Sequence, residues 1–464
     1  MPTHSRHIRM ATASLALLAL TIIMSLAFPA SAHCKPFPIP LSDKKYDPPL
    51  TEISSLNGDG RLLAVQAAQG SKGPGRVLSI AKDGKSETLE EPGAVTELTV
   101  PAERLWIAGV APRLDAEGAE AAPEGEQDVS GARVPVTGVQ VVLGGGGETY
   151  TVVYKTSGAY YELRHYDKRG KLLFIATPRD GYGLKAVRVS RDGGRVLVVD
   201  ESALTNRKPG GAGGGPSGTL GQRLYLYNKT GRLLADHEVG DDPDTWLEAA
   251  ECLMADDGSY FVCTRGRGGR HGTSVVLFDQ DGAIAWENAY FSEHRLTEDF
   301  GGVFGIKGGS KSLLAFLDGR GDMRMFERAS YGFDFWLARG GKFAYVIIFK
   351  PFDLEKSGVP ARIKEAFPKA KVVGVDLAAL LPGVDRPGIA IAPDGEAFVL
   401  SYLDSNSGLD STRLSYYDTS LKRFWNEELN GGGITVRFVD GHTGFILRYG
   451  NPVTRIVYYE VRDK

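Results

Sequence analysis

Residues 187–199 read VRVSRDGGRVLVV, in which an alternating apolar run and a continuous apolar run flank Asp192, Gly193 and Gly194. Alternation with a period of two is typical of a β-strand with one buried face. Asp-Gly and Gly-Gly readily adopt the positive φ angles that tight turns between antiparallel strands require. The stretch therefore predicts a β-hairpin whose turn is centred on Asp192 and Gly193.

The same pattern returns along most of the chain. Strong copies are AECLMADDGSYFVC at 250–263 and IAIAPDGEAFVL at 389–400. Weaker copies surround the dipeptides Asp59-Gly60, Gly145-Gly146, Gly308-Gly309, Gly340-Gly341 and Asp440-Gly441. Hairpin after hairpin, with turn residues between the apolar runs, predicts an all-β protein.

A second element follows several of these hairpins: an aromatic or apolar run and then a polar turn that ends in glycine, as in LYLYNKTG at 224–231 and VLFDQDG at 276–282. The two turns lie 25 residues apart in three places, from Asp59 to Gly84, from Gly145 to Gly170 and from Asp257 to Gly282. The spacing is 27 from Asp394 to Leu421, and 39 from Asp192 to Gly231, where a glycine-rich insertion lengthens it. A recurring pair of turns predicts a repeated unit of four strands.

Units of four strands and roughly 45–55 residues are typical of β-propellers. The run APDGEAFV at 392–399 resembles the apolar-Ser-Pro-Asp-Gly pattern of WD40-like and TolB-like repeats, and SRDG at 190–193 matches it in part. The run DQDGAIAW at 279–286 is similar to the quinoprotein-type repeat, in which Asp-x-x-Gly precedes Trp. The resemblance implies a single β-propeller of seven or eight four-stranded blades over residues 50–464, with strands from both ends of that range sharing a blade. It implies no activity, because propellers host many functions.

The composition limits the partners to be expected. Lys and Arg total 54 against 57 Asp and Glu, which gives a net charge of −3. Nucleic-acid binding needs a concentrated excess of cations, so nucleic acid is not expected as a partner. Glycine is frequent, at 59 of 464 residues, but it follows no Gly-X-Y period, which excludes a collagen.

The first 32 residues predict export. Arg6 and Arg9 precede an uncharged, mostly apolar run of 18 residues from 11 to 28, and Pro29 is followed by Ala-Ser-Ala. This order is that of a secretory signal peptide cut after Ala32. The alternative is an uncleaved membrane anchor, since a run of this length can just span a bilayer. We expect residues 1–32 to be a signal peptide and residues 33–49 an N-terminal extension. The protein is then periplasmic or extracellular, with no membrane span after cleavage.

Export permits disulfides, and the chain has three cysteines, Cys34, Cys252 and Cys263. If Asp257-Gly258 is a two-residue turn, Cys252 faces Cys263 across the hairpin, within reach of a disulfide. A three- or four-residue turn is expected to shift the register and separate them. The two side chains are therefore either a disulfide or a pair of buried free thiols.

Three insertions interrupt the repeat, at about 112–131, 206–221 and 359–371. The first is an acidic stretch rich in Ala, Glu, Gly and Pro, and the second is rich in glycine; both compositions predict loops. The third begins with Pro360 and continues with good helix formers, which predicts a short helix.

Two further loops carry residues that bind ligands in other proteins. DSNSGLD at 404–410 places oxygen ligands at alternate positions, as a calcium loop does, but no Glu closes it; the alternative is a polar turn. RGRGGRH at 265–271 offers Arg265, Arg267 and Arg270 to an anionic ligand, or is a solvated loop. We expect no cofactor, with calcium as the weak alternative.

No local catalytic signature stands out, since the sequence has neither a His-Glu-x-x-His pair nor a Gly-x-Ser-x-Gly elbow. The leading hypothesis is a non-catalytic propeller that binds a protein, a peptide or an envelope polymer such as a polysaccharide on one ring face. The alternative is a hydrolase or lyase with a site at the mouth of the propeller channel, assembled from loops of several blades. Carboxylates or histidines that converge there would favour the enzyme, and an apolar, aromatic rim would favour binding.

Overall fold

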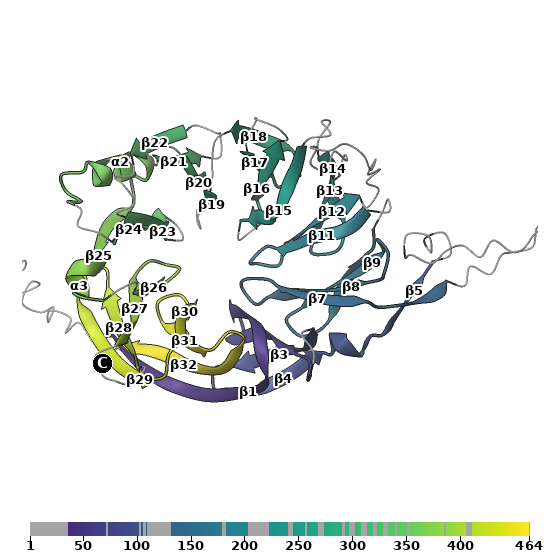
Figure 1. Cartoon of the computed structure of the whole chain (residues 1–464), viewed down its shortest axis with the longest axis horizontal. Coiled ribbons are helices and arrows are strands. Elements are labelled where there is room, and N and C mark those ends of the chain that lie inside the picture. Colours follow the sequence, from purple (N-terminus) through teal and green to yellow (C-terminus); the bar gives the residue numbers. More distant parts are fainter. Residues whose placement is uncertain are drawn as a thin grey trace, which may run out of the picture.

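The computed structural model describes residues 36–70, 73–101, 104, 108, 131–178, 182–202, 222–239, 245–255, 258–267, 273–289, 293–296, 302–307, 313–318, 323–327, 333–338, 341–349, 353–384, 387–404 and 411–463. This part of the chain is nearly all β-strand, so the all-β prediction is confirmed. Figure 1 shows the sheets following one another in chain order around a common centre, a propeller-like arrangement.

Five of the sheets within this range are antiparallel and are built from four consecutive strands each. Their strands are β7 (Gly138–Leu143), β8 (Thr149–Lys155), β9 (Tyr161–Asp167) and β10 (Leu172–Ala176); β11 (Tyr182–Val189), β12 (Arg195–Ser202), β13 (Gln222–Asn228) and β14 (Leu233–Val239); β15 (Thr245–Met254), β16 (Tyr260–Arg267), β17 (Thr273–Asp279) and β18 (Ile284–Ala289); β19 (Glu293–Leu296), β20 (Gly302–Lys307), β21 (Leu313–Asp318) and β22 (Met323–Glu327); and β26 (Gly388–Ile391), β27 (Ala397–Asp404), β28 (Ser411–Asp418) and β29 (Arg423–Asn430).

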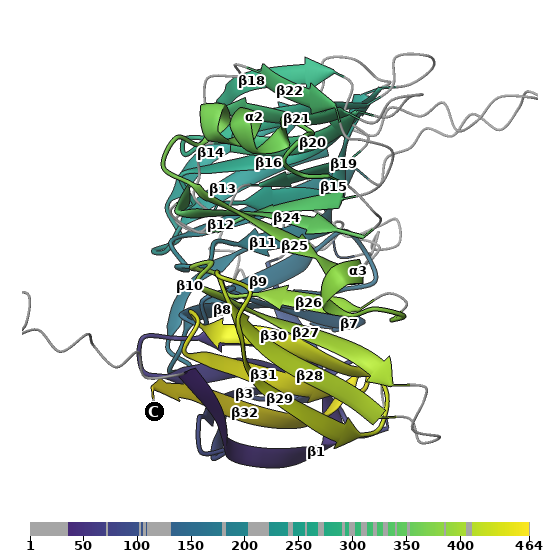
Figure 2. The ribbon, with the colours of Figure 1, turned by 90° about the vertical axis from the view of Figure 1, so that its left-hand side faces the viewer.

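A seven-stranded sheet joins strands from both ends of the chain. Its order is β30 (Ile434–Asp440), β31 (Gly444–Tyr449), β32 (Val453–Asp463), β1 (Pro36–Leu56), β2 (Arg61–Ala67), β3 (Pro74–Ala81) and β4 (Ser86–Glu90). The long strand β1 pairs with β32 through residues 36–45 and with β2 through residues 50–56. Seen from the side, β1 runs along the outer edge of the sheet that contains β31 and β32 (Figure 2). Residues 36–49, expected to precede the repeat, therefore lie within a paired strand and cover a sheet edge.

One sheet departs from the pattern. β23 (Phe333–Leu337) and β24 (Phe343–Ile348) are antiparallel, but β25 (Lys371–Asp376) runs parallel to β24. Parallel neighbours need a crossover connection, and α2 (Val359–Ala366) lies in it, with Pro360 in its first turn and Ile363 fully buried. The helix expected within 359–371 is thus present. The short α3 (Leu377–Leu380) follows β25, and the short η1 (Pro92–Ala94) precedes a two-stranded hairpin of β5 (Glu97–Val100) and β6 (Ala132–Pro135).

The predicted turns lie between the expected strands. Gly193, Gly258 and Gly395 all have positive φ, as do Gly84, Gly170, Gly231 and Gly282 in the second set of turns. The first turns are longer than two residues: the Gly193 N–H donates to Ser190 O, and the Ser190 N–H donates to Arg195 O. This four-residue loop has the same centre, Asp192 and Gly193, as the two-residue turn that was expected. The strands on either side therefore pair in the expected register.

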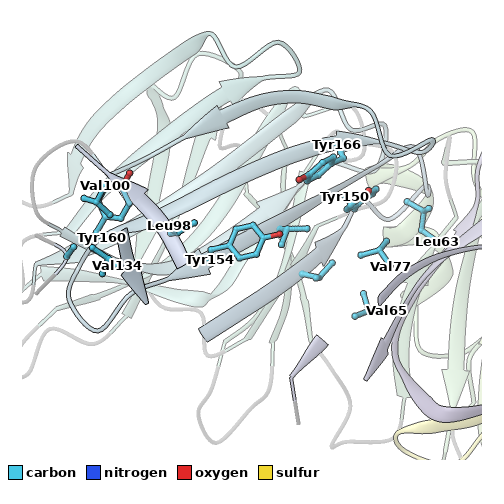
Figure 3. Close-up of a cluster of buried hydrophobic side chains, with 13 residues drawn as sticks. Leu63, Val65, Val77, Leu98, Val100, Val134, Tyr150, Tyr154, Tyr160 and Tyr166 are labelled. Atoms are coloured by element: carbon cyan, nitrogen blue, oxygen red, sulfur yellow. The ribbon is translucent and has the colours of Figure 1, made fainter. Parts of the chain in front are cut away.

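The core lies between neighbouring sheets rather than inside a single one. In the cluster of Figure 3, Leu63 and Val77 of the first sheet meet Tyr150 and Tyr166 of the second, and the two tyrosine rings stack with centroids 5.0 Å apart. Each fully buried side chain of this size contributes roughly 1.5–3 kcal/mol. Burial between sheets means that each sheet depends on its neighbours in the ring.

Several expectations fall on residues outside the described ones: the signal peptide at 1–32, Cys34, nearly all of the insertion at 112–131 and all of that at 206–221. No helix among the described residues is long and apolar enough to cross a membrane.

Candidate functional site

The two ends of the strands differ in how they are connected. We call the end that carries the short hairpins β1–β2, β7–β8, β11–β12, β15–β16, β23–β24, β26–β27 and β30–β31 the turn face. These hairpins lie next to one another: Ser55 N–H donates to Gly145 O at 2.9 Å, and Gly146 N–H donates to Arg191 O at 3.0 Å. Since antiparallel strands alternate in direction, the connections β2–β3 and β12–β13 and those between sheets lie at the opposite end. We call that end the loop face; the strand ends that flank residues 203–221 belong to it.

Four second-set turns and the β1–β2 turn are capped by their own side chains. In each, a side-chain oxygen accepts hydrogen bonds from the backbone N–H groups two and four residues later; the capping residues are Asp167, Asn228, Asp279 and Asp418 in the second set and Asn57 in the β1–β2 turn. Asn and Asp favour this local bonding because their side chains are short. The turns are therefore determined locally, by sequence.

Ion pairs link neighbouring sheets at the turn face. Lys168 Nζ lies 3.2 Å from Asp59 Oδ2 and 3.0 Å from Glu148 Oε2. Lys82 Nζ lies 2.9 Å from Asp440 Oδ2. The hydrogen bond that Lys168 donates to Glu148 is the main reason that the pKa of Lys168 is raised. Lys168 thus joins its own sheet to the seven-stranded sheet through Asp59. Lys82 and Asp440 join the two ends of the seven-stranded sheet.

His442 and Asp394 form a further pair at this face, with 2.8 Å between Nδ1 and Oδ2. Burial would raise the pKa of Asp394, but hydrogen bonds from the His442 ring and from the Glu396 and His442 backbone outweigh it and lower the pKa. The nearby Thr443 hydroxyl donates to Asp440 O at 2.8 Å. The pair joins the β26–β27 and β30–β31 turns and has the geometry of a link between sheets.

Five ionisable side chains from three parts of the chain are linked by electrostatic interactions. We call Glu52 on β1, Arg188 on β11, Arg191 in the following turn, Arg437 on β30 and Arg448 on β31 the central cluster. Arg188 and Arg437 both interact electrostatically with Glu52, and Arg437 also interacts with Arg191 and Arg448. The sheet of β11 and the sheet of β30 are not neighbours in chain order, and Figure 1 shows β11 and β30 on the inner side of the arrangement of sheets.

Backbone groups orient the members of this cluster. Arg437 Nη1 donates to Ile53 O, and Arg188 Nε donates to Cys252 O at 3.0 Å. The Glu52 carboxylate accepts a hydrogen bond from the Leu143 N–H. Two of these contacts join different sheets, and the Arg437 bond to Ile53 joins β30 to β1 within the seven-stranded sheet.

Partial desolvation shifts the ionisation of the cluster. Burial raises the pKa of Glu52, and outweighs the Leu143 hydrogen bond and the charges of Arg188 and Arg437. Burial lowers the pKa of Arg437, and the positive charges of Arg448 and Arg191 lower it further. Yet Glu52 is exposed, and the four arginines are half-buried. A side chain that faces the centre of a ring meets both conditions, because protein surrounds it while water reaches it.

Arg448 differs from the others in its hydrogen bonding. Its Nε is buried and has no hydrogen-bond partner among the residues described. A buried polar group without a partner costs about 1–3 kcal/mol. Within the described part of the chain, the cluster therefore joins four cations and one carboxylate and leaves at least one donor unused.

Bulges aim these side chains. The register of β1 against β2 shifts between Leu50 and Glu52, and that of β11 against β12 shifts between Leu184 and Ala186. A β-bulge turns nearby side chains from the direction that strict alternation gives them. Sequence reasoning missed the cluster because its members come from strands far apart along the chain, although Arg188 and Arg191 lie in the stretch that decided the fold. The available signal was an arginine within an apolar strand.

Cys252 and Cys263 are joined as a disulfide in the structure, with Cα atoms 4.2 Å apart and both side chains fully buried. The pairing Leu253↔Val262 and Met254↔Phe261 continues outward to this pair. The Gly258 N–H donates to Ala255 O, so the turn begins earlier than a two-residue turn does. A longer turn on the same centre keeps the cysteines opposite each other, contrary to the expected separation.

The other predicted ligand loops lie largely outside the described residues. Arg265 and Arg267 belong to β16, but their side chains and residues 268–272 are not among those described. Asp404 ends β27, and residues 405–410 of the proposed calcium loop lie outside as well. Among the described residues, no three His, Cys, Asp or Glu side chains form a group that could hold a metal ion.

A polar pocket of about 400 Å³ lies at the loop face of the first sheet. Gln66, Gln69, Arg76 and Glu91 are among its lining residues, and Arg76 Nε lies 3.2 Å from Glu91 Oε1. Gly75 lines it too, where a Cβ would lie 2.7 Å from Ala68 Cα, so the backbone approaches closely here. The pocket thus offers both hydrogen-bond donors and hydrogen-bond acceptors at the loop face.

Comparison with known proteins gives no family. No protein-family model matches the sequence, and no curated protein matches it. Among solved structures, the chain is similar to Raptor from Chaetomium thermophilum, at 8% identity and a TM-score of 0.37 over 93% of this chain and 29% of that one. It is also similar to a prolyl endopeptidase, at 12% identity and a TM-score of 0.43 over 87% of this chain and 55% of that one. The chain thus spans less than a third of the first protein and about half of the second.

Proposed function

We propose that the chain is a closed β-propeller of eight blades. The seven-stranded sheet supplies two blades, because β1 contributes to both, and the five four-stranded sheets and the sheet of β23–β25 supply six. Contacts between the innermost strands of successive sheets, such as β30 with β1 and β11 with β15, support this count. Electron microscopy of the purified protein would test it; a ring with seven sectors would contradict it.

The proposed function of this propeller is to bind a partner protein, a peptide or an envelope polymer at its loop face, outside the cytoplasm. The observation that carries the proposal is the separation of the two faces. Short, self-capped turns and ion pairs between sheets occupy the turn face, whereas the longer connections and the polar pocket lie at the loop face. Binding residues concentrate on loops that a rigid scaffold holds in place.

Binding of polymers to the purified protein tests the proposal. The probes are polygalacturonate, dextran and a ten-residue polyglutamate peptide, which separate anionic polysaccharide, neutral polysaccharide and acidic peptide. The double variant Gln66→Ala, Arg76→Ala removes donors from the loop-face pocket, and Lys168→Ala alters the turn face as the control. We expect one probe to bind the wild type and the control and to bind the pocket variant at least about tenfold more weakly, a loss of ~1.4 kcal/mol. Equal binding by the pocket variant would contradict a loop-face site.

Export is the part of the proposal that rests on residues 1–32. Its test is the N-terminal sequence of the protein recovered from secreting cells, which should begin at His33. A protein that retains its first residues would contradict cleavage at Ala32.

Glu52 favours a second candidate function, a hydrolase or lyase. Its raised pKa and its place among arginines suit a general acid or base that acts on an anionic substrate. The measurement is the chain length of polygalacturonate after incubation with the protein. Shortening by the wild type but not by Glu52→Gln, with polymer binding retained, would establish the enzyme; unchanged chain length with both would exclude this reaction for this polymer.

A further inference from the structure

Charge is unevenly distributed around Arg437. This guanidinium interacts with two arginines, Arg191 and Arg448, and with one carboxylate, Glu52. Like charges repel, and they repel more strongly where protein partly excludes water. A bound anion would convert this repulsion into attraction, so the arrangement favours an occupant of negative charge.

The arginines of β30 and β31 are placed for such an occupant. Arg437 on β30 is fixed by its bond to Ile53 O, which immobilises the guanidinium before any ligand arrives. Arg448 lies on the adjacent strand β31, which pairs with β30 through Ile446 opposite Arg437 and Thr435 opposite Arg448. Its Nε is buried without a partner among the residues described, although its side chain is only half-buried. Water therefore reaches part of this arginine, although Nε itself is shielded.

Guanidinium chemistry identifies the class of ligand. The planar fork of an arginine donates two parallel N–H bonds to the two oxygens of a carboxylate or phosphoryl group. We propose that Arg437 and Arg448 form an oxyanion-binding site at the centre of the ring, which takes a carboxylate or phosphoryl group of the ligand. Arg188 and Arg191 add positive potential, and Glu52 limits the number of negative charges that the site accepts. This inference goes beyond the proposed function, because it names a second site, separate from the loop-face pocket.

Calorimetric titration of the full-length mature protein tests the site. The probes are inorganic phosphate and succinate at constant ionic strength, which distinguish a phosphoryl from a carboxylate ligand. We expect one of them to bind the wild type with one-to-one stoichiometry. In Arg448→Gln its affinity should fall at least about tenfold, and Arg448→Lys should recover only part of it, because an ammonium lacks the fork.

The control is Arg133→Gln. Arg133 on β6 is an exposed arginine, 3.6 Å from a carboxylate oxygen of Glu97, and it lies away from the central cluster. The Arg133→Gln variant should bind the probe with the affinity of the wild type. No binding of either probe at tens of millimolar, or equal affinity in Arg448→Gln and the wild type, would overturn the proposal. Circular dichroism of each variant at the titration temperature shows that a loss of binding is not a loss of folding.

The polymer assay, run on the same variants, separates this inference from the proposed function. If a polymer binds the wild type and Arg448→Gln equally while phosphate and succinate do not bind, the oxyanion site is wrong and the binding scaffold stands. If phosphate or succinate binds through Arg448 while no polymer binds, the oxyanion site stands and the polymer scaffold is contradicted.

Discussion

At the turn face, Lys168 meets two carboxylates and Lys82 meets one, whereas at the centre of the ring Arg437 meets two further arginines. The first arrangement is attractive, and Lys168 joins two sheets through Asp59. The second is repulsive and leaves a donor of Arg448 without a partner among the described residues. The same chain therefore pairs its charges in one region and leaves them in excess in another.

The difference separates stability from function. Ion pairs and capped turns hold each sheet against its neighbours, and substitutions there should weaken folding without altering recognition. A cluster of like charges opposes folding, since desolvated cations are costly unless paired. Its retention is understandable where a ligand supplies the missing charge, and substitutions there should weaken recognition without weakening folding.

The largest expected effect is at a turn. Gly193 has a φ of 71°, and a Cβ there would lie 2.4 Å from the Thr149 side chain of the neighbouring sheet. Gly193→Ala should lower the free energy of unfolding by about 4 kcal/mol, about half from the left-handed backbone and half from the clash. Gly358 has the same φ of 71° with nothing within 4 Å, so Gly358→Ala is the matched control and should cost about 1–2 kcal/mol. Denaturant unfolding measures both; equal losses would show that the turns do not press against the neighbouring sheet.

A buried histidine beneath the same turn predicts a pH dependence. His165 is fully buried, 2.8 Å from Thr151 Oγ1, and burial lowers its pKa from 6.5 to about 4. The folded protein then binds fewer protons than the unfolded chain between these values, so acidification favours unfolding. The stabilisation is fully present above pH 6.5 and should fall by about 3 kcal/mol as the pH approaches 4.

The variant His165→Gln separates this contribution from that of the carboxylates. It keeps a polar side chain but does not titrate, so its unfolding free energy should depend less on pH in that window. Unfolding curves at several pH values for both proteins provide the measurement. An identical pH dependence would show that His165 is not the group that titrates.

In the central cluster, removing a charged side chain should not lower the free energy of unfolding. Arg448→Met removes a cation beside Arg437 and a buried nitrogen without a partner. We expect the free energy of unfolding to stay the same or to rise by up to about 1 kcal/mol. Thermal unfolding without added phosphate is the measurement. A loss of more than about 1 kcal/mol would make Arg448 a structural residue and would remove the contrast between the two regions.

The sequence predicted what depends on local geometry. Gly193, Gly258 and Gly395 lie in turns because positive φ is a local requirement, and their spacing revealed the repeated unit. The turns were expected to be two residues long. The same dipeptide can lie at the centre of a two-residue or of a four-residue loop. Both loops pair the flanking strands in the same register, so Cys252 still lies opposite Cys263.

The features that the sequence did not reveal arise from contacts distant along the chain. β1 serves two sheets only because β32 returns to it, and β25 runs parallel to β24 only because α2 crosses over. Nothing in an apolar strand says whether it will be the innermost one. Arg188 and Arg437 could therefore not be recognised as neighbours of Glu52 before the ring was assembled.

The smallest expected effect tests the attractive half of the comparison. Lys168→Met removes contacts of 3.2 and 3.0 Å to Asp59 and Glu148, from a lysine that is 20% exposed. Such a network at a protein surface should contribute about 0.5–1 kcal/mol to unfolding at low ionic strength, and most of it should vanish in 1 M salt, where the screening length is about 3 Å. Lys85 is the control, since its partner Asp83 lies in the same turn and its side chain is 86% exposed; Lys85→Met should have no measurable effect. A loss at Lys168 that persists in high salt would mean that its aliphatic stem, rather than its charge, joins the sheets. Paired charge would then not be what distinguishes the turn face from the centre.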